Sequence, residues 1–186
     1  MNAEEMFRKS GAILEGHFVL TSGRHSPVYW EKFRVMQYPV YVQQLCGMIA
    51  DHFRNDSIQL VAGPTTAGII LAFEVARQLD VRAIYAEKAE NKTFAFKRGA
   101  AINSGDRVLV VDDVLTTGGS IKEVIAAVKE LKGNVVGVGM LVDRTEQKFD
   151  FGAPLFGCLR AEAVSYPPDK CPLCEAKIHL VKPGGS

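Results

Sequence analysis

Two hydrophobic patterns alternate along most of this chain. Short apolar runs, typical of strands buried in a parallel sheet, occur at 58–62, 82–87, 108–111, 134–142 and 154–159. Apolar residues at helical spacing occur between them, at 38–53, 69–79 and 121–131. This alternation predicts an α/β fold with a mostly parallel, twisted sheet and helices on its faces.

The first 37 residues follow a different pattern. Helical spacing over 3–14 is interrupted at Ser10 and Gly11, and 16–30 has the pattern of two short strands around a turn at 21–24. We predict a single domain over the 186 residues. Its small N-terminal hood (1–37) would join a C-terminal tail (160–186), and its core would span 38–159.

The most informative stretch is 107–120. A buried-strand run at 108–111 is followed by two carboxylates, Asp112 and Asp113, and a buried strand carries such charge only when it has a role. Hydroxyl residues and two glycines then lead into a helix. An ordinary strand-to-helix turn with solvated aspartates is the alternative interpretation. All these groups lie at a strand's carboxyl end, where open α/β sheets bind ligands, which favours a site.

This loop has the means to hold a phosphate. Gly118 and Gly119 allow a sharp turn, and the following helix begins with N–H groups that lack partners within the helix. The neighbouring carboxylates would repel a bare phosphate, so we expect them to face sugar hydroxyls or Mg²⁺. A phosphorylated sugar meets both requirements.

The stretch from Val108 to Ser120 resembles the phosphoribosyl-pyrophosphate (PRPP) signature of the type I phosphoribosyltransferases. The resemblance implies that Asp112 and Asp113 contact the ribose hydroxyls and act in catalysis. It also implies that the loop holds the 5′-phosphate. The PRPP-binding positions carried over from this motif are Asp112, Asp113, Val114, Leu115, Thr116, Thr117, Gly118, Gly119 and Ser120.

A second resemblance points to the base. The stretch 16–30 is similar to the N-terminal segment of the orotate phosphoribosyltransferases, which belongs to the hood over the pyrimidine. The resemblance implies roles in that segment for Ser22, Gly23, Ser26, Tyr29 and Trp30. It implies further that Arg144, together with Thr116, orients orotate. A planar guanidinium suits a carboxylate, although an Asp143–Arg144 surface pair is the simpler alternative.

The resemblance also implies which residues bind the pyrophosphate part of PRPP. The loop at 63–68 would grip pyrophosphate, with Thr66 and Ala67 as PRPP-binding positions, and Lys88 would be a PRPP-binding and catalytic lysine. Many family members have lysines where this chain has Thr21 and Ala67. The resemblance also implies a mobile catalytic loop that begins at Lys88 and closes over PRPP. Its residues Lys92, Lys97 and Arg98 are candidates to replace that charge.

The composition of the chain limits the kinds of binding partner that we expect. The net charge is +1, with 23% charged residues, so no electrostatic argument favours nucleic acid or a membrane surface. With no signal-peptide pattern and only four cysteines, we expect a cytoplasmic protein. Cys171 and Cys174 form one C-x-x-C pair, which either stays unmetallated or binds Zn²⁺ with help from Cys158 and His179 or from a second subunit.

We therefore predict an enzyme that transfers phosphoribose from PRPP to orotate in pyrimidine biosynthesis. Mg²⁺ would be its cofactor, held through PRPP. The resemblance implies a homodimer in which the mobile loop reaches the neighbouring site. The alternatives are a purine phosphoribosyltransferase and a non-catalytic PRPP-binding regulator. Among the remaining histidines, His17 has no partner pattern, and His25 is considered as a residue that points into the ligand site.

Overall fold

The structure is a computed structural model that describes residues 1–20, 22–90, 93–145, 149–162 and 164–183. It comprises two compact units. The hood unit contains Met1–Tyr38 and Glu162–Ser186, and the core unit contains Pro39–Ala161. The sequence-based boundaries lie at 37/38 and 159/160.

The core unit is built on one six-stranded sheet with the order β5-β4-β3-β6-β7-β8. Its strands are β3 (Leu60–Pro64), β4 (Arg82–Lys88), β5 (Phe94–Phe96), β6 (Arg107–Leu115), β7 (Asn134–Asp143) and β8 (Leu155–Arg160). All neighbouring pairs are parallel except β4 with β5, so β5 is an antiparallel edge strand. The predicted mostly parallel sheet is confirmed.

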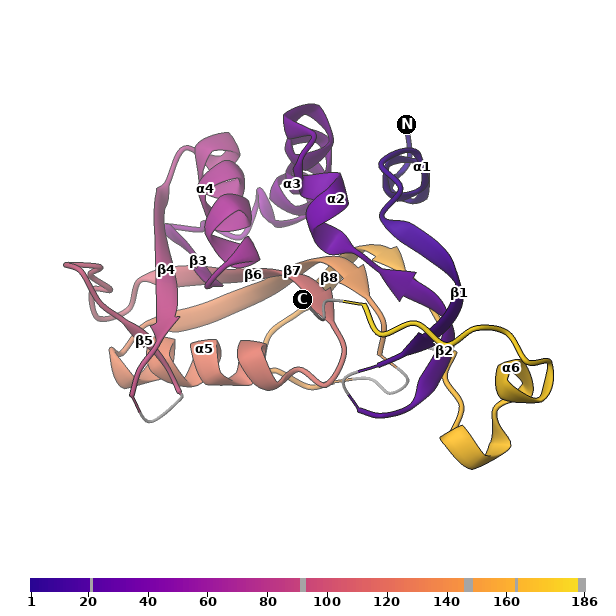
Figure 1. Cartoon of the computed structure of the whole chain (residues 1–186). Coiled ribbons are helices and arrows are strands. Elements are labelled where there is room, and N and C mark those ends of the chain that lie inside the picture. Colours follow the sequence, from indigo (N-terminus) through magenta and orange to yellow (C-terminus); the bar gives the residue numbers. More distant parts are fainter. Residues whose placement is uncertain (21, 91–92, 146–148, 163, 184–186) are drawn as a thin grey trace. The chain divides into compact units, whose positions relative to one another are not determined.

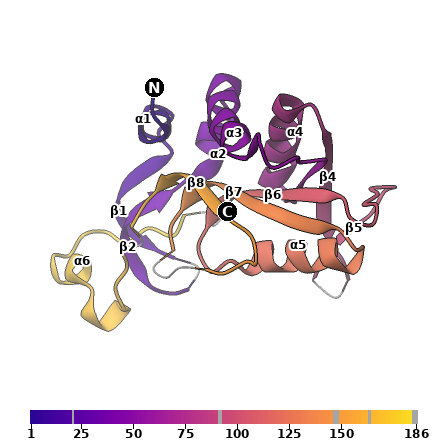
Figure 2. The ribbon, with the colours of Figure 1, turned by 180° about the vertical axis from the view of Figure 1, so that it is seen from behind.

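Helices cover both faces of this sheet (Figures 1 and 2). Helices α3 (Pro39–Phe53) and α4 (Ala67–Leu79) lie on one face, and α5 (Gly119–Glu130) lies on the other. Two glycines of β7 permit the close packing of α3: a Cβ at Gly139 would lie 2.5 Å from Ile49 Cγ2, and one at Gly137 would overlap the Phe53 ring. The α5 face buries an aliphatic cluster that includes Val108, Val110, Val124 and Val128.

One strand differs from its prediction in a way that matters for the site. The apolar run predicts a strand over 108–111, whereas β6 continues to Leu115 and includes both aspartates. Pairing with β7 explains the extension, because Asp112 is in register with Met140 and Leu115 with Asp143. Pairing with the neighbouring strand thus keeps this charged segment extended.

The hood unit begins with α1 (Ala3–Lys9), which has a capping box formed by Asn2 and Glu5. The predicted helical pattern over 3–14 is wrong beyond Lys9, because Ile13 and Leu14 belong to a strand. This strand, β1 (Ile13–Val19), pairs antiparallel with β2 (His25–Trp30), with a bulge between Glu15 and Phe18. Helix α2 (Lys32–Met36) follows and was not predicted.

The tail supplies the rest of the hood unit. It contains a 3-10 turn, η1 (Pro168–Lys170), and the short helix α6 (Pro172–Glu175). It runs beside both hairpin strands, since Val181 bridges to Phe18 and Tyr166 bridges to His25. In the part of the chain that the structure describes, no helix is long and apolar enough to cross a membrane.

Candidate active site

The candidate site lies along the carboxyl edge of the core sheet. Because β4, β3, β6 and β7 are parallel neighbours, the segments that follow them emerge on the same edge. Along this edge lie, in order, Lys88, which ends β4, and then Thr66, Thr116 and Arg144, which follow β3, β6 and β7. The fold therefore brings together residues that are far apart in the sequence.

The two aspartates are held by their own backbone. Asp112 Oδ1 accepts the N–H of Asp113 at 2.9 Å, and Asp113 Oδ1 accepts the N–H of Val114. Asp112 is half-buried and the Asp113 side chain is almost fully buried, with 3% of its surface exposed. These carboxylates are therefore not solvated turn residues, and the surroundings of Asp113 strengthen any hydrogen bond that it makes to a ligand.

The loop after β6 turns sharply into α5. Gly118 is the N-cap of that helix and has φ = 72°, a conformation that L side chains rarely adopt. A Cβ at this position would also lie 3.2 Å from Cζ of Phe151. The turn leaves Thr116, Thr117 and Ser120 exposed beside the first N–H groups of the helix.

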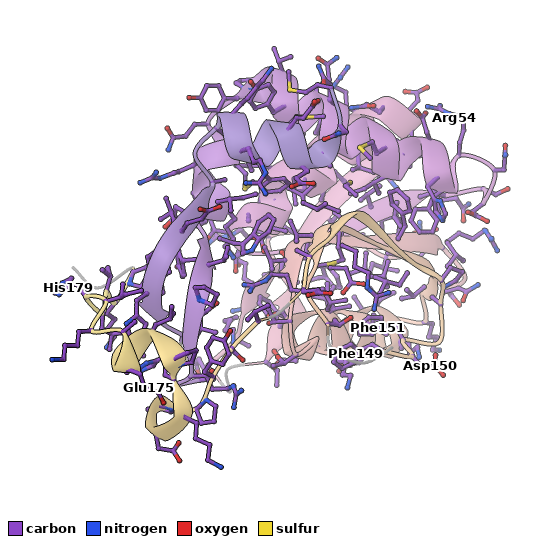
Figure 3. The ribbon with its side chains drawn as sticks, turned by 90° about the vertical axis from the view of Figure 1, so that its right-hand side faces the viewer. Arg54, Phe149, Asp150, Phe151, Glu175 and His179 are labelled. Carbon is purple, nitrogen blue, oxygen red and sulfur yellow. The ribbon has the colours of Figure 1, made fainter. Side chains whose placement is uncertain are left out.

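A pair of stacked phenylalanines supports this loop, and sequence reasoning did not find it. Phe149 and Phe151 lie with ring centroids 5.7 Å apart and an interplanar angle of 15° (Figure 3). Lys122 of α5 places its ammonium 5.2 Å from the centroid of Phe149. The apolar spacing in Phe149-Asp150-Phe151 was the only sequence signal for this support.

The loop between β3 and α4 approaches its helix closely. A Cβ at Gly63 would overlap the backbone of Gly68, so only glycine fits there. The N–H of Thr65 donates to the carbonyl oxygen of Ala86 at 2.9 Å, and the peptide bond between Thr65 and Thr66 is cis. Thr66 is exposed and Ala67 is buried at the start of α4.

Arg144 directly follows β7. Its backbone N–H donates to the carbonyl oxygen of Leu115 at 2.9 Å, which ties it to the last residue of β6. Its side chain is 9% exposed, and burial lowers the pKa of the guanidinium. Asp143 Oδ1 accepts the N–H and the hydroxyl of Thr145 at 2.9 and 2.7 Å. Arg144 is thus a buried arginine at the site edge and not a solvated surface residue.

The candidate basic residues differ in their surroundings. Lys88 is exposed at the end of β4, with its ammonium 5.2 Å from the centroid of Phe94. Lys97 is exposed. Arg98 Nε donates to Glu87 Oε1 at 2.9 Å, so its charge is shared with a carboxylate. Lys92 and Thr21 lie outside the described residues.

The hairpin residues of the hood unit form their own arrangement. Gly23 has φ = 78° and donates its N–H to the carbonyl oxygen of Leu20, which closes the turn beside Ser22. Tyr29 packs on Phe18, with centroids 5.8 Å apart, and Trp30 packs edge-on against Phe7 at 5.4 Å. The buried hydroxyl of Ser26 lies 2.9 Å from the carbonyl oxygen of Val28 and 2.8 Å from that of Val164. Ser26 therefore stabilises the hairpin.

Comparison with known proteins defines the family. A family model described as a phosphoribosyl transferase domain matches residues 37–164, which include the whole edge described above. The chain therefore belongs to the phosphoribosyltransferase family.

The relatives narrow this class. An orotate phosphoribosyltransferase of Desulforamulus reducens is 47% identical over 187 residues, covering 99% of this chain and 97% of the relative. One of Pelotomaculum thermopropionicum is 49% identical, covering 96% of this chain and 94% of the relative. The crystal structure of orotate phosphoribosyltransferase from Aeropyrum pernix matches with a TM-score of 0.73 and 28% identity, covering 86% and 93% of the two chains.

The fold alone does not distinguish orotate from purine enzymes. An adenine phosphoribosyltransferase from Thermoanaerobacter pseudethanolicus matches with a TM-score of 0.61 and 21% identity, covering 72% of this chain and 88% of that one. Substrate choice must therefore be argued from particular residues.

Proposed function

We propose that this chain transfers phosphoribose from PRPP to orotate, giving orotidine 5′-monophosphate and pyrophosphate in pyrimidine biosynthesis. One observation carries the proposal: a buried arginine, Arg144, is hydrogen-bonded to Leu115, the last residue of the strand that carries the acid pair and leads into the proposed PRPP loop. Near-full-length relatives named orotate phosphoribosyltransferases support the same choice over a purine enzyme or a regulator.

The loop between β6 and α5 would bind the ribose 5-phosphate. The loop hydroxyls and the first N–H groups of α5 are donors for the 5′-phosphate, and the helix dipole favours its negative charge. Asp112 and Asp113 would accept hydrogen bonds from the ribose hydroxyls. Both carboxylates are already oriented by backbone N–H groups, so binding costs little reorganisation.

Arg144 and Thr116 would orient orotate. A guanidinium pairs with a carboxylate through two parallel hydrogen bonds, and a buried guanidinium gains more from that pairing than a solvated one. The pyrimidine-binding roles of Ser22, Gly23, Tyr29 and Trp30 are proposed on the resemblance of the hood sequence alone.

The pyrophosphate would lie between the loop at Thr66 and Ala67 and the ammonium of Lys88. Ala67 contributes only its backbone, so the side-chain charge must come from elsewhere. Lys88 and Lys97 are the exposed described candidates, and Lys92 is proposed from the sequence. Arg98 is the weaker candidate because Glu87 already holds its guanidinium.

In the reaction, the bond from the ribose C1 to the pyrophosphate oxygen breaks, C1 bonds to N1 of orotate, and the proton on N1 is lost to solvent. The electron pair of the broken bond leaves with pyrophosphate, and positive charge develops on the ribose. The protein's residues hold both reactants in line and stabilise these charges, so catalysis is mainly positioning and electrostatics. In this proposal, the carboxylates of Asp112 and Asp113 would stabilise the cationic ribose.

Mg²⁺ is the proposed cofactor. The donors at this edge are carboxylate and hydroxyl oxygens, from Asp112, Asp113 and the two loops, and hard oxygen ligands are those that Mg²⁺ takes. When bound with PRPP, the ion would neutralise charge on the pyrophosphate.

We also propose a cytoplasmic homodimer with a mobile loop that serves the neighbouring site. The dimer and the loop rest on the family resemblance. The cytoplasmic location is supported by the low number of cysteines, four in 186 residues, which is too few for a disulfide framework.

The direct test is pyrophosphate release from PRPP and Mg²⁺ with orotate, uracil, adenine and hypoxanthine in parallel. We expect turnover with orotate alone, and a large loss of activity at subsaturating orotate in Arg144→Ala. Arg54→Ala is the matched control, because Arg54 is an exposed arginine that directly follows α3 and forms an ion pair with Asp51 of the same helix (Figure 3). Turnover with a purine, or PRPP binding without turnover on any base, would contradict the proposal.

A further inference from the structure

Four metal-ligating side chains converge within the hood unit, and the proposed transfer reaction gives none of them a role. They are His17 of β1, His25 of β2, and Cys171 and Cys174 of the C-terminal tail. One potential ligand atom from each residue lies within 4.8 Å of all the others. Three of the four residues are buried: His17 is 2% exposed, His25 7% and Cys171 1%.

The spacing fits four ligands around one ion. Tetrahedral Zn²⁺ with bonds of about 2.0 Å to nitrogen and 2.3 Å to sulfur requires N–S separations of about 3.5 Å and an N–N separation of about 3.3 Å. Cys171 Sγ lies 3.5 Å from His17 Nε2, and Cys174 Sγ lies 3.8 Å from His17 Nε2 and 3.3 Å from His25 Nδ1. The two imidazole nitrogens are 2.9 Å apart, so an ion requires only a small expansion of the cluster.

The orientation of His17 is that of a metal ligand. Its Nδ1 lies 2.8 Å from the carbonyl oxygen of Ile178 and donates to it, because a carbonyl can only accept. In the neutral ring this leaves Nε2 with a lone pair that points into the cluster. A backbone carbonyl that fixes the tautomer in this way is the usual outer partner of a ligating histidine.

The two thiols are placed together by a tight turn. Cys171 is the N-cap of α6, and the N–H groups of Cys174 and Glu175 donate to its carbonyl oxygen at 3.1 and 3.2 Å. A C-x-x-C turn of this kind presents both sulfurs on one side. Glu175 and His179, labelled in Figure 3, lie on and beyond this helix, and neither belongs to the group of four.

Cys158 and His179, which were considered from the sequence as further zinc ligands, do not belong to this cluster. The thiol of Cys158 on β8 donates to the carbonyl oxygen of Leu45 at 3.3 Å in the core unit. Burial raises the pKa of that thiol to about 12, so it is a poor thiolate ligand. His179 is exposed. His25, considered from sequence for the ligand site, instead faces His17 and Cys174.

The cluster also lies where the C-terminal tail runs beside the hairpin, so a metal ion there would cross-link the two segments. His17 and His25 flank the hairpin turn, and the tail bonds to the hairpin beside both of them: Val181 N–H donates to the carbonyl oxygen of His17 at 2.8 Å, and the His25 N–H donates to Tyr166 at 2.9 Å. A small unit buries little apolar surface and often needs a metal or a disulfide. An ion here would join tail and hairpin.

We propose that His17, His25, Cys171 and Cys174 form a structural zinc site within one chain. The His₂Cys₂ set, mixing two imidazoles with two thiolates, is the donor set that Zn²⁺ prefers in closed four-coordinate sites. Binding of Zn²⁺ releases the protons of the two thiols, and no redox step is involved. The zinc ion would stabilise the hood unit, and it is a different ion from the Mg²⁺ proposed as the cofactor.

The test begins with the full-length protein, purified without a histidine tag or chelators. Elemental analysis should find about one zinc per chain. After chelation and addition of Co²⁺, the protein should show the visible absorption and thiolate charge-transfer bands of tetrahedral cobalt. Chelation should also lower the melting temperature by about 5 °C or more, since an ion that binds only the folded state stabilises it.

Variants then assign the ligands. Cys174→Ser changes the one exposed member of the cluster, and this variant and His17→Gln should each lose most of the zinc. Cys158→Ser and His179→Gln, which alter the same residue types outside the cluster, should retain it. These variants address the ligands, while the cobalt spectrum of the wild type does not depend on any variant folding.

Three results would overturn the proposal. The first is a wild-type protein with well under stoichiometric zinc and no tetrahedral cobalt spectrum. The second is a Cys171–Cys174 disulfide in the freshly purified protein, detected by mass spectrometry. The third is zinc that persists in both ligand variants and disappears in Cys158→Ser or His179→Gln.

Discussion

The backbone N–H of Arg144 donates to the carbonyl oxygen of Leu115 at 2.9 Å. This single hydrogen bond joins the ends of β7 and β6 and places a buried guanidinium beside the loop that follows the acid pair. The residue proposed to select the base is therefore fixed to the strand that carries the residues proposed to hold the sugar. A change at Arg144 should affect orotate far more than PRPP.

Arg144→Ala should raise the KM for orotate about 10- to 100-fold, since a charged hydrogen-bonded pair contributes about 1.5–3 kcal/mol. The KM for PRPP should change little. Initial-rate kinetics with each substrate varied in turn measures both constants. An equal rise in the two KM values would contradict a role confined to the base.

Asp113→Asn should lower kcat about 10- to 100-fold, because an amide cannot stabilise a cationic ribose as a carboxylate does. The Asn side-chain oxygen can still accept the Val114 N–H that Asp113 accepts now, so the fold should persist. Steady-state kinetics and a thermal melt test the two statements together. Unchanged turnover in a folded variant would refute the catalytic role.

Gly118→Ala should weaken PRPP binding and cost about 1 kcal/mol or more of unfolding free energy. The left-handed φ of 72° strains any side chain, and the new methyl group would crowd Phe151. Gly105→Ala is the matched control: its φ is 86°, and a Cβ there meets nothing within 4 Å. It should lose stability through backbone strain and keep its affinity for PRPP. Loss of affinity in both variants would show that the effect is not local to the loop.

Asp106 should make the stability of the core unit depend on pH. Its pKa is lowered, first by the N–H of Asn103 that it accepts at 2.8 Å and also by Arg82, whose Nη2 lies 2.6 Å away. A depressed folded pKa stabilises the protein above the unfolded value of about 3.9, and this contribution is lost as the pH falls through the folded pKa.

Asp106→Asn should therefore lower the unfolding free energy by about 1–2 kcal/mol at neutral pH, and the difference from wild type should shrink in acid. Urea titrations at several pH values measure it. Asp51→Asn, at an exposed acid paired with Arg54, should show little change at any pH. A difference for Asp106→Asn that is the same at all pH values would exclude the charge as its cause.

Sequence alone determined the features that neighbouring residues specify. The acid pair, the hydroxyls and the glycines of 112–120 are contiguous, so their chemistry could be interpreted before any fold was known. The alternation of buried strands and helices predicted the parallel sheet, and the parallel sheet predicted one shared ligand edge. Arg144 could be placed at that edge by the same rule.

Tertiary structure decided what depends on distant partners. β6 continues through Asp113 to Leu115 because β7 pairs with it, and Ile13 and Leu14 leave the helical pattern to pair with Trp30 and Tyr29. The cysteine pair could be seen in the sequence, but its histidines could not. His17 and Cys171 are 154 positions apart, and only the tail folding back along the hairpin brings sulfur and nitrogen to 3.5 Å. Such contacts leave no periodic signal, because chain folding and not spacing creates them.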